Sequence, residues 1–318
     1  MSNVLVVTPV YNDWSAFDTL LGEIDAQVPM FQANVDVVAI DDGSTVSPLL
    51  LPNLPLLRHI RAVDVVHLVC NLGNQRAVAI GIAHAQRASS YDLVVILDSD
   101  GEDRPLELPN LLQAHRRHPE RIVVALRTRR SEGIRFKVFY SLYKNLFRVL
   151  IGRKIDFGNF CLIPGQHVGR LAHMPELWSH LPATILRSKL PVERVETERG
   201  KRYSGVSSMN VIALIGHGLS AMAVFSDTLF VRVLAASCAI MTLGGLIAAV
   251  ATGLRLFTGL AIPGWTTTVV GVATLLVLQG LILTATATFA TLSNRANMLF
   301  VPAINGHSFV SHISRLKE

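Results

Sequence analysis

The chain has 318 residues, of which 50% are hydrophobic and only 16% are charged, and its formal net charge is +6. An ordinary soluble domain carries roughly 25% charged residues; here residues 1–210 have an ordinary composition and the remainder is strongly apolar. The basic residues are scattered and accompany no nucleic-acid reading motif, so we expect an anionic lipid surface or a phosphorylated substrate as partner, and no nucleic acid. Cys70, Cys161 and Cys238 lack metal-ligand spacing and are odd in number, which predicts reduced thiols.

Short apolar runs alternate with helically spaced apolar residues along the first part of the chain. The expected strands are Val4–Val7, Val35–Ile40, Val63–Val69, Leu93–Leu97 and Ile122–Leu126. The expected helices run from Asp13 to about Gln27, from Arg76 to about Ala88 and from about Leu106 to His118. This alternation predicts an α/β fold with right-handed crossovers and a mostly parallel sheet.

Polar groups follow four of these strands, at Pro9–Asn12, Asp41–Asp42, Asn71 and Asp98–Asp100. The carboxyl ends of parallel strands meet at one edge of a sheet, and ligands bind outside that edge. The sequence has no glycine-rich dinucleotide fingerprint after its first strand and no phosphate loop ending in Gly-Lys-Ser/Thr, which argues against nicotinamide enzymes and P-loop NTPases. The pattern therefore predicts one polar crevice of another kind.

The apolar run Leu93–Leu97 ends in four carboxylates, at Asp98, Asp100, Glu102 and Asp103. Carboxylates so close together repel one another unless a cation lies among them. Mg²⁺ and Mn²⁺ prefer one or two carboxylates together with phosphate oxygens, so this strand end is suited to holding a metal ion against a diphosphate. The alternative is a solvated acidic turn in which Asp103 caps the following helix.

Four loop sequences carry a family resemblance: P-V-Y-N at residues 9–12, D-D-G-S at 41–44, N-L-G-N-Q at 71–75 and D-S-D-G-E-D-R-P at 98–105. Together they resemble the loops of inverting family 2 glycosyltransferases, and among these the polyprenyl-phosphate glycosyltransferases of the dolichol-phosphate mannose synthase group. The resemblance covers about residues 3–210. It implies a GT-A fold, which is a Rossmann-like nucleotide-diphospho-sugar transferase domain, followed here by a two-helix transmembrane hairpin.

The resemblance also implies roles for individual residues. Tyr11 and Asp42 would contact the nucleoside base or ribose with help from Asp41, and Asp98 would face the ribose or sugar. The full set of implied nucleotide-sugar contacts is Pro9, Tyr11, Asn12, Asp41, Asp42, Asn71 and Asp98. Asp98 and Asp100 would hold Mg²⁺ or Mn²⁺ on the diphosphate, with Asp100 the main metal ligand.

The sequence departs from the family pattern on the acceptor side. Asn74 and Ser208 stand where many members carry lysine, and Cys161 stands where they carry arginine. Other cationic and polar groups are available to bind an acceptor phosphate, because arginine forks match phosphate oxygens. The candidates are Arg127, Arg129, Arg130, Arg202 and Ser207. A basic surface that faces anionic lipid is an equally good explanation for any one of these arginines.

The expected reaction is attack on the anomeric carbon of a nucleotide sugar, with a nucleoside diphosphate as the leaving group. The metal ion would neutralise charge that develops on the diphosphate. A phosphate acceptor is already ionised near neutral pH, whereas a hydroxyl acceptor needs a carboxylate that takes its proton. Asp156 is the first candidate for that base, with Glu102 and Asp103 as alternatives.

The apolar remainder predicts a membrane hairpin. Val233–Leu254 contains no charged residue and would be about 33 Å long as a helix, close to the roughly 30 Å of a hydrocarbon core. A second span runs from Trp265 to about Thr291, and residues 258–264 make the turn. Basic residues precede the first span and recur after the second, while the connection holds only Arg255, which places both ends in the cytoplasm.

The predicted organisation is a GT-A domain over residues 1–210, a juxtamembrane interfacial helix over 211–227, two transmembrane helices within 228–293 and a cytoplasmic tail over 294–318. We expect an enzyme of the bacterial inner membrane, with its catalytic domain in the cytoplasm, that transfers sugar to polyprenyl phosphate. Transfer to a hydroxyl of a glycolipid or polysaccharide, or a catalytically silent membrane scaffold, are the alternatives. The formation of a homo-oligomer is left open.

Overall fold

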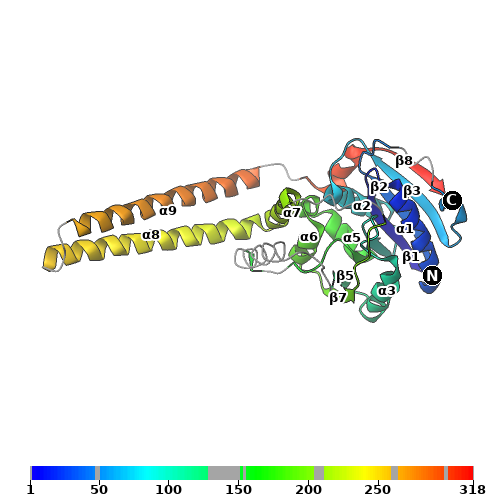
Figure 1. Cartoon of the computed structure of the whole chain (residues 1–318), viewed down its shortest axis with the longest axis horizontal. Helices are drawn as coiled ribbons and strands as arrows, with labels where there is room; N and C mark the ends of the chain where they lie inside the picture. The colour runs from blue at the N-terminus through cyan, green and yellow to red at the C-terminus, as the bar shows by residue number, and fades with distance from the viewer. Residues whose placement is uncertain are drawn as a thin grey trace. The chain divides into compact units, whose positions relative to one another are not determined.

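The computed structural model describes residues 2–46, 51–127, 151–152, 155–203, 211–258, 264–296 and 300–317 (Figure 1). The chain divides into two compact units. The first combines Met1–Tyr140, Lys154–Val224 and Leu299–Glu318, and the second combines Ser141–Arg153 and Phe225–Met298. The last twenty residues therefore belong to the same unit as the first strands.

The first unit is built on one sheet, which has eight strands in the order β7-β5-β6-β4-β1-β2-β3-β8 over the residues described above. The strands are β1 (Ser2–Val10), β2 (Ala33–Asp41), β3 (Ile60–Leu68), β4 (Leu93–Ile96), β5 (Ile122–Arg127), β6 (Cys161–Pro164), β7 (Val192–Thr197) and β8 (Val310–Lys317). Strands β1 to β4 pair in parallel with one another, β5 and β7 are a parallel pair, and β6 and β8 run antiparallel to their neighbours. The sheet is thus mixed, with a parallel centre.

Two layers of helices cover the sheet. Helices α1 (Trp14–Gln27) and α3 (Leu108–Arg117) pack in one apolar core, and α2 (Asn74–Ala88), α5 (Gly165–Ala172) and α6 (Leu181–Ser188) pack in the other. The period of two along a strand explains the two cores, because alternate side chains of β1 face opposite layers. Val4 and Val6 enter the core with α1, whereas Leu5 and Val7 enter the core with α2.

Shorter elements complete this unit. They are the 3-10 turns Val28–Met30, Leu54–Leu56, Pro105–Glu107, Pro175–Trp178 and Gly306–Phe309, and the helices α7 (Val211–Ala223) and α10 (Pro302–Asn305). All five strands and all three helices expected from the apolar pattern are present within a few residues of their expected bounds. The α/β class and the parallel pairing of the first four strands are confirmed.

Strand β8 differs from the expectation of a tail over residues 294–318. It runs antiparallel to β3 from Val310 to Lys317 and forms the edge of the sheet (Figure 1). Its apolar residues, Val310, Ile313 and Leu316, are three positions apart. That spacing lacks the alternation typical of a half-buried strand, so the sequence pattern did not indicate one. The pairing partner lies about 250 positions earlier in the chain, beyond any local signal.

The second unit consists mainly of two long helices, α8 (Ser226–Phe257) and α9 (Trp265–Ala296). Over their most apolar stretches the mean hydropathy is 2.2 and 2.1, and both are long and apolar enough to cross a membrane. Small residues line their contact: Ser237 and Ala251 are buried, and a side chain added at Gly244 would come within 3.2 Å of the Ala273 carbonyl. Such residues allow helix backbones to approach closely in a membrane.

Candidate active site

The loops after β1 and β2 are fastened together by Asn12. Its backbone N–H donates to Ser44 Oγ at 2.8 Å, and its Oδ1 accepts from the backbone N–H of Thr45 at 2.8 Å. Asn12 has a φ of 55°, a left-handed conformation that asparagine tolerates better than most residues. Asn12, one of the residues predicted to contact the nucleotide sugar, therefore holds the loops after β1 and β2 in place.

Asp41 and Asp42 hold neighbouring loops with their carboxylates. Asp41 accepts from the Ser44 N–H at 2.9 Å and from His67 Nδ1 at 2.8 Å. Asp42 is almost fully buried and accepts from the N–H groups of Leu72 and Gly73 at 2.7 and 2.8 Å. Burial raises the pKa of Asp42, while those two N–H groups act in the opposite direction. Both carboxylates therefore stabilise loops at the carboxyl edge of the parallel strands.

Three further predicted nucleotide contacts differ in exposure. Pro9 is buried within β1. Tyr11, in contrast, is 50% exposed just beyond the end of β1, and Asn71 is exposed in the loop after β3. Tyr11 and Asn71 thus present side chains to solvent at the carboxyl edge of the parallel strands, where a ligand can reach them.

The carboxylate cluster after β4 is tied to the segment that follows β7. Gly101 has a φ of 86°, and a side chain there would come within 2.8 Å of the Tyr203 ring, so glycine is required for this turn. The Tyr203 N–H donates to the Asp100 carbonyl at 3.0 Å, and the Gly200 N–H donates to the Glu102 carbonyl at 2.9 Å. The two segments form one wall.

Two arginines of this wall pair with the carboxylates. Arg202 donates through Nε and Nη2 to Asp100 Oδ2, at 3.0 and 2.6 Å. Arg199 donates to Glu102 Oε2, with its shorter bond at 2.6 Å. Each guanidinium offsets the repulsion between neighbouring carboxylates. The proximity of Asp100 and Glu102 holds the pKa of Arg202 above its ordinary value, although burial acts against this.

Asp103 does not cap a helix, so the capping role that the alternative interpretation gave it is wrong. Its side chain is 1% exposed and accepts from the Asp98 N–H at 3.1 Å. The residue that precedes the 3-10 turn at Pro105–Glu107 is Arg104, and no side chain caps that turn. Asp103 instead fixes the backbone at Asp98, which is the end of the strand segment that delivers the carboxylates.

The chemistry of the donor set fits a divalent cation. Asp98 and Asp100 supply hard oxygen atoms at one strand end, as Mg²⁺ and Mn²⁺ prefer. Over the ranges that the structure describes, no three His, Cys, Asp or Glu side chains form a complete metal-ligand group. This arrangement suits a cation that completes its coordination with phosphate oxygens, and Arg202 would have to move away from Asp100 when such an ion binds.

The predicted acceptor-side residues are only partly described. Asp156 Oδ1 lies 3.5 Å from Nε of Arg194, a residue of β7, and the Asp156 side chain is mostly buried. Arg202, expected to bind an acceptor phosphate, is paired with Asp100, the residue expected to hold the metal ion. Arg129, Arg130, Ser207 and the side chain of Arg127 lie outside the described residues.

Two groups of polar residues at this edge were not expected from the sequence. His67 of β3 joins Asp41 to Ser314 of β8, with both ring nitrogens in hydrogen bonds of 2.8 Å. The sequence signal for it is a histidine in a mostly apolar strand, which also contains Arg61 and Asp64. A chain of side-chain amides also reaches Asp98, and its first member, Asn74, is a residue at which the sequence departs from the pattern of the family that it resembles. That departure was the available signal.

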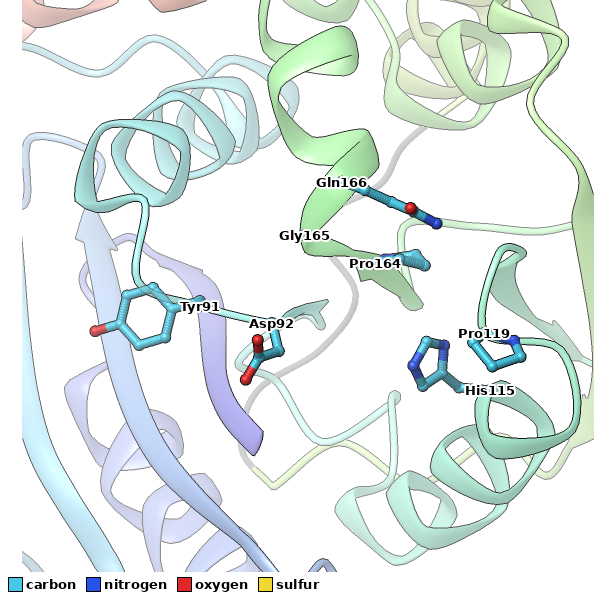
Figure 2. A pocket seen from close by; sticks show the side chains of 7 residues that line it. All are labelled: Tyr91, Asp92, His115, Pro119, Pro164, Gly165 and Gln166. Carbon is cyan, nitrogen blue, oxygen red and sulfur yellow. The ribbon is translucent and has the colours of Figure 1, made fainter. Parts of the chain in front are cut away.

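A pocket of ≈ 350 Å³ has a different set of lining residues (Figure 2). It is lined by Tyr91, Asp92, His115, Pro119, Pro164, Gly165 and Gln166. Asp92 precedes β4 and Pro164 ends the antiparallel β6, so the pocket is at the opposite edge of the sheet from the carboxylates. None of the predicted site residues lines it.

Comparisons with known proteins show the family and support the fold. Residues 5–178, more than half of the chain, match the model of the glycosyl transferase family 2. A solved structure of a mycobacterial protein superposes with a TM-score of 0.51 and 16% identity, covering 71% of this chain and 74% of that one. At that identity the likeness concerns the fold alone, and it agrees with the GT-A architecture expected from the sequence.

Two related sequences are undecaprenyl-phosphate 4-deoxy-4-formamido-L-arabinose transferases. The relative from Erwinia tasmaniensis is 26% identical over 225 residues, covering 67% of this chain and 66% of that protein. The relative from Pectobacterium carotovorum is 25% identical over 265 residues, covering 81% of this chain and 78% of that protein. This chain spans slightly less than two thirds of the first relative. Since the family pattern extends over most of the mixed sheet and its strand-end loops, the chain belongs to glycosyl transferase family 2.

Proposed function

We propose that this protein is a membrane-anchored, metal-dependent glycosyltransferase that moves a sugar from a nucleotide-diphosphate sugar to polyprenyl phosphate, with inversion at the anomeric carbon. The observation that carries the proposal is the pair Asp98 and Asp100 at the carboxyl edge of a family 2 sheet, in a chain that also has two apolar helices of membrane-spanning length. The names of the relatives support the acceptor class, because those proteins act on undecaprenyl phosphate.

In the proposed reaction an oxygen of the acceptor phosphate attacks the anomeric carbon, and the bond from that carbon to the diphosphate oxygen breaks. A bound divalent ion supplies charge neutralisation on the departing diphosphate. Asp98 and Asp100 would hold this ion. Arg202, released from Asp100, has a planar fork that matches phosphate oxygens and would then bind one of the phosphates. No base is needed, because the acceptor is ionised near neutral pH.

The proposed location follows from the connectivity of the chain. Helix α8 follows the first unit, and the chain after α9 re-enters the first unit to form β8. Two crossings therefore leave the whole first unit on one side of a membrane. Basic residues flank the hairpin on that side, as in cytoplasmic segments. We place the first unit at the cytoplasmic face of a bacterial inner membrane, where its lipid acceptor is accessible.

Replacement of Asp100 by Asn tests the proposal directly. Membranes that contain the protein are incubated with Mg²⁺ or Mn²⁺ and a panel of radiolabelled nucleotide sugars, and label in lipid is counted before and after mild acid. The wild-type protein should form an acid-labile lipid-linked product. Asp100→Asn should reduce its formation by about 100-fold or more, because several kcal/mol of charge stabilisation depends on the ion.

Glu120→Gln is the matched control, since Glu120 lies on the loop between α3 and β5 and its side chain is 57% exposed. It should transfer sugar at the wild-type rate. Transfer by Asp100→Asn at a rate close to that of the wild type would refute the metal role. An acid-resistant lipid product would indicate that the acceptor group is a hydroxyl and not a phosphate. A wild-type protein that binds no nucleotide sugar in the presence of metal would indicate a scaffold.

A further inference from the structure

A continuous line of side-chain amides begins at the proposed metal carboxylate. Asn74 Nδ2 donates to Asp98 Oδ1 at 3.0 Å. Asn159 Nδ2 donates to Asn74 Oδ1 at 3.0 Å. Gln75 Nε2 donates to Asn159 Oδ1 at 2.9 Å, and Gln75 Oε1 accepts from the backbone N–H of Leu181 at 2.9 Å. We call Asn74, Asn159 and Gln75 the amide relay.

The direction of every hydrogen bond in the amide relay is determined by its two ends. An ionised carboxylate only accepts and a backbone N–H only donates. With Asp98 accepting at one end and Leu181 donating at the other, each amide between them has one orientation that satisfies both neighbours. A flipped amide would set two oxygens or two N–H groups face to face, which is unfavourable in a partly buried network.

The relay joins three parts of the first unit that are distant in sequence. Asn74 and Gln75 begin α2, Asn159 precedes β6, and Leu181 begins α6. The α6 end is itself well anchored, because His180 is buried, caps the helix by accepting from the Ala183 N–H at 3.2 Å, and contacts His217 of α7 at 3.1 Å. A fixed N–H at Leu181 therefore imposes its polarity on the relay.

Gln75 is the member of the amide relay farthest from Asp98, and its N–H and its oxygen bind partners in two other segments, Asn159 before β6 and Leu181 of α6. Gln75 and Asn159 are half-buried, whereas Asn74 is exposed beside Asp98. Gln75, the member farthest from the Asp98 carboxylate, is thus better protected from water than Asn74. It is placed to control the orientation of the exposed one.

We propose that Gln75 is a positioning residue for the metal site: through Asn159 it keeps an N–H of Asn74 directed at Asp98 and so orients that carboxylate toward the cation. The inference rests on the proposed function, because it takes Asp98 as a metal ligand. Gln75 itself touches neither substrate nor metal, and it acts by setting the polarity of a hydrogen-bonded line.

The substitution Gln75→Glu reverses that polarity. The ionised carboxylate that it introduces would still accept from Leu181 but could not donate to Asn159. Asn159 would then turn its N–H toward this carboxylate, Asn74 would turn its N–H toward Asn159, and an amide oxygen would face Asp98. We expect the affinity for Mn²⁺ to fall about tenfold, the loss typical of a hydrogen bond to a charged group. Gln75→Met interrupts the line without reversing it and should weaken binding less.

The direction of the expected change in Mn²⁺ affinity distinguishes a reversal of hydrogen-bond polarity from a simple electrostatic effect. An added negative charge near a cation site attracts the cation and would strengthen Mn²⁺ binding. Asn159→Asp provides an independent test of the same sign, since it removes the N–H that Asn74 accepts. Both acidic variants should therefore bind Mn²⁺ more weakly in spite of their charge. Gln113→Glu, on the exposed face of α3, is the control with the same chemical change and should bind as the wild type does.

The measurement is the electron paramagnetic resonance signal of free Mn²⁺, titrated with the full chain in detergent at pH 8, with UDP or GDP in parallel samples. Thermal unfolding of each variant is followed without metal. The inference is supported if Gln75→Glu and Asn159→Asp weaken binding while Gln75→Met retains most of it. It is overturned if the acidic variants bind as tightly as the wild type or more tightly, or if Gln75→Met loses as much as Gln75→Glu. Absence of Mn²⁺ binding by the wild type would instead overturn the proposed function.

Discussion

At the scale of single residues, the carboxylates of this site are held by many more partners than their motif indicates. Asp41 and Asp42 accept from loop N–H groups, Asp100 pairs with Arg202, and Asp98 accepts from Asn74. These partners come from several different strand ends. An aspartate motif in the sequence is therefore compatible with several roles. The hydrogen-bond partners of each aspartate in the structure show which of these roles the local geometry permits.

His180 is the residue for which the structure predicts a clear pH dependence. Burial and the nearby His217 lower the pKa of His180 to about 3 from its ordinary value of 6.5. The unfolded chain takes up a proton below pH 6.5 that the folded chain refuses until about pH 3. The contribution of His180 to the free energy of unfolding should therefore be fully present above pH 6.5. It should fall as the pH drops from 6.5 toward 3, by at most about 1.4 kcal/mol per pH unit.

His180→Asn should remove the contribution of His180 and so weaken this dependence, because asparagine also caps helices but does not titrate. Thermal unfolding of the full chain in detergent at pH 7.5 and pH 5 measures it. His173→Asn, at an exposed position, should keep the wild-type difference between the two pH values. An identical pH dependence in His180→Asn and the wild type would contradict the prediction.

At the scale of elements, β8 links the chain that follows the two long apolar helices to the sheet edge at which the parallel strands end. Ser314 of β8 holds His67, which holds Asp41, and the rings of His312 and His67 stack with centroids 4.2 Å apart. Lys317 donates to the carbonyls of two residues at the start of β3 and just before it, Ile60 and Leu57, at 2.7 and 2.8 Å. The strand thus protects the edge of β3 and supports a loop of the candidate site.

Removal of β8 should destabilise the first unit. A chain that ends after Phe309 loses the β3 pairing, the Lys317 bonds and the ion pair between Arg315 and Asp64. We expect the melting temperature to fall by roughly 10 °C, as a loss of about 3 kcal/mol produces in a unit of this size. A chain that lacks only Glu318 is the control. Equal melting temperatures for the two truncated chains would show that β8 contributes nothing.

At the scale of the whole molecule, the connectivity predicts membrane sidedness. Cys70 is exposed in the first unit, and Thr258 follows the last residue of α8, in the segment that connects α8 to α9. In intact bacterial cells, an impermeant maleimide should label a cysteine introduced by Thr258→Cys, with Cys70 replaced by Ser. Cys70 of the otherwise unchanged chain should react only after the membrane is opened. Labelling of Cys70 in intact cells would contradict the proposed orientation.

Much of the fold could be predicted from local pattern, because the first five strands are mostly apolar runs with polar loops at their ends. Strands β6 and β7 were not expected: β6 is four residues long and contains Pro164, and β7 mixes charged residues with valine. Neither has a periodicity that identifies a strand on its own. They are recognisable only beside their partners in the sheet.

The sequence by itself determined the α/β class, the family, the carboxylate motif and the two long apolar helices, since each depends on residue type and on spacing within a few turns of chain. Only the tertiary structure decided which partners those motif residues have. Arg202 meets Asp100, Ser314 reaches His67, and Gln75 meets Asn159 across 102, 247 and 84 positions. A hydrogen bond depends on distance in space, and no local pattern encodes a distance between segments that only the folded sheet brings together.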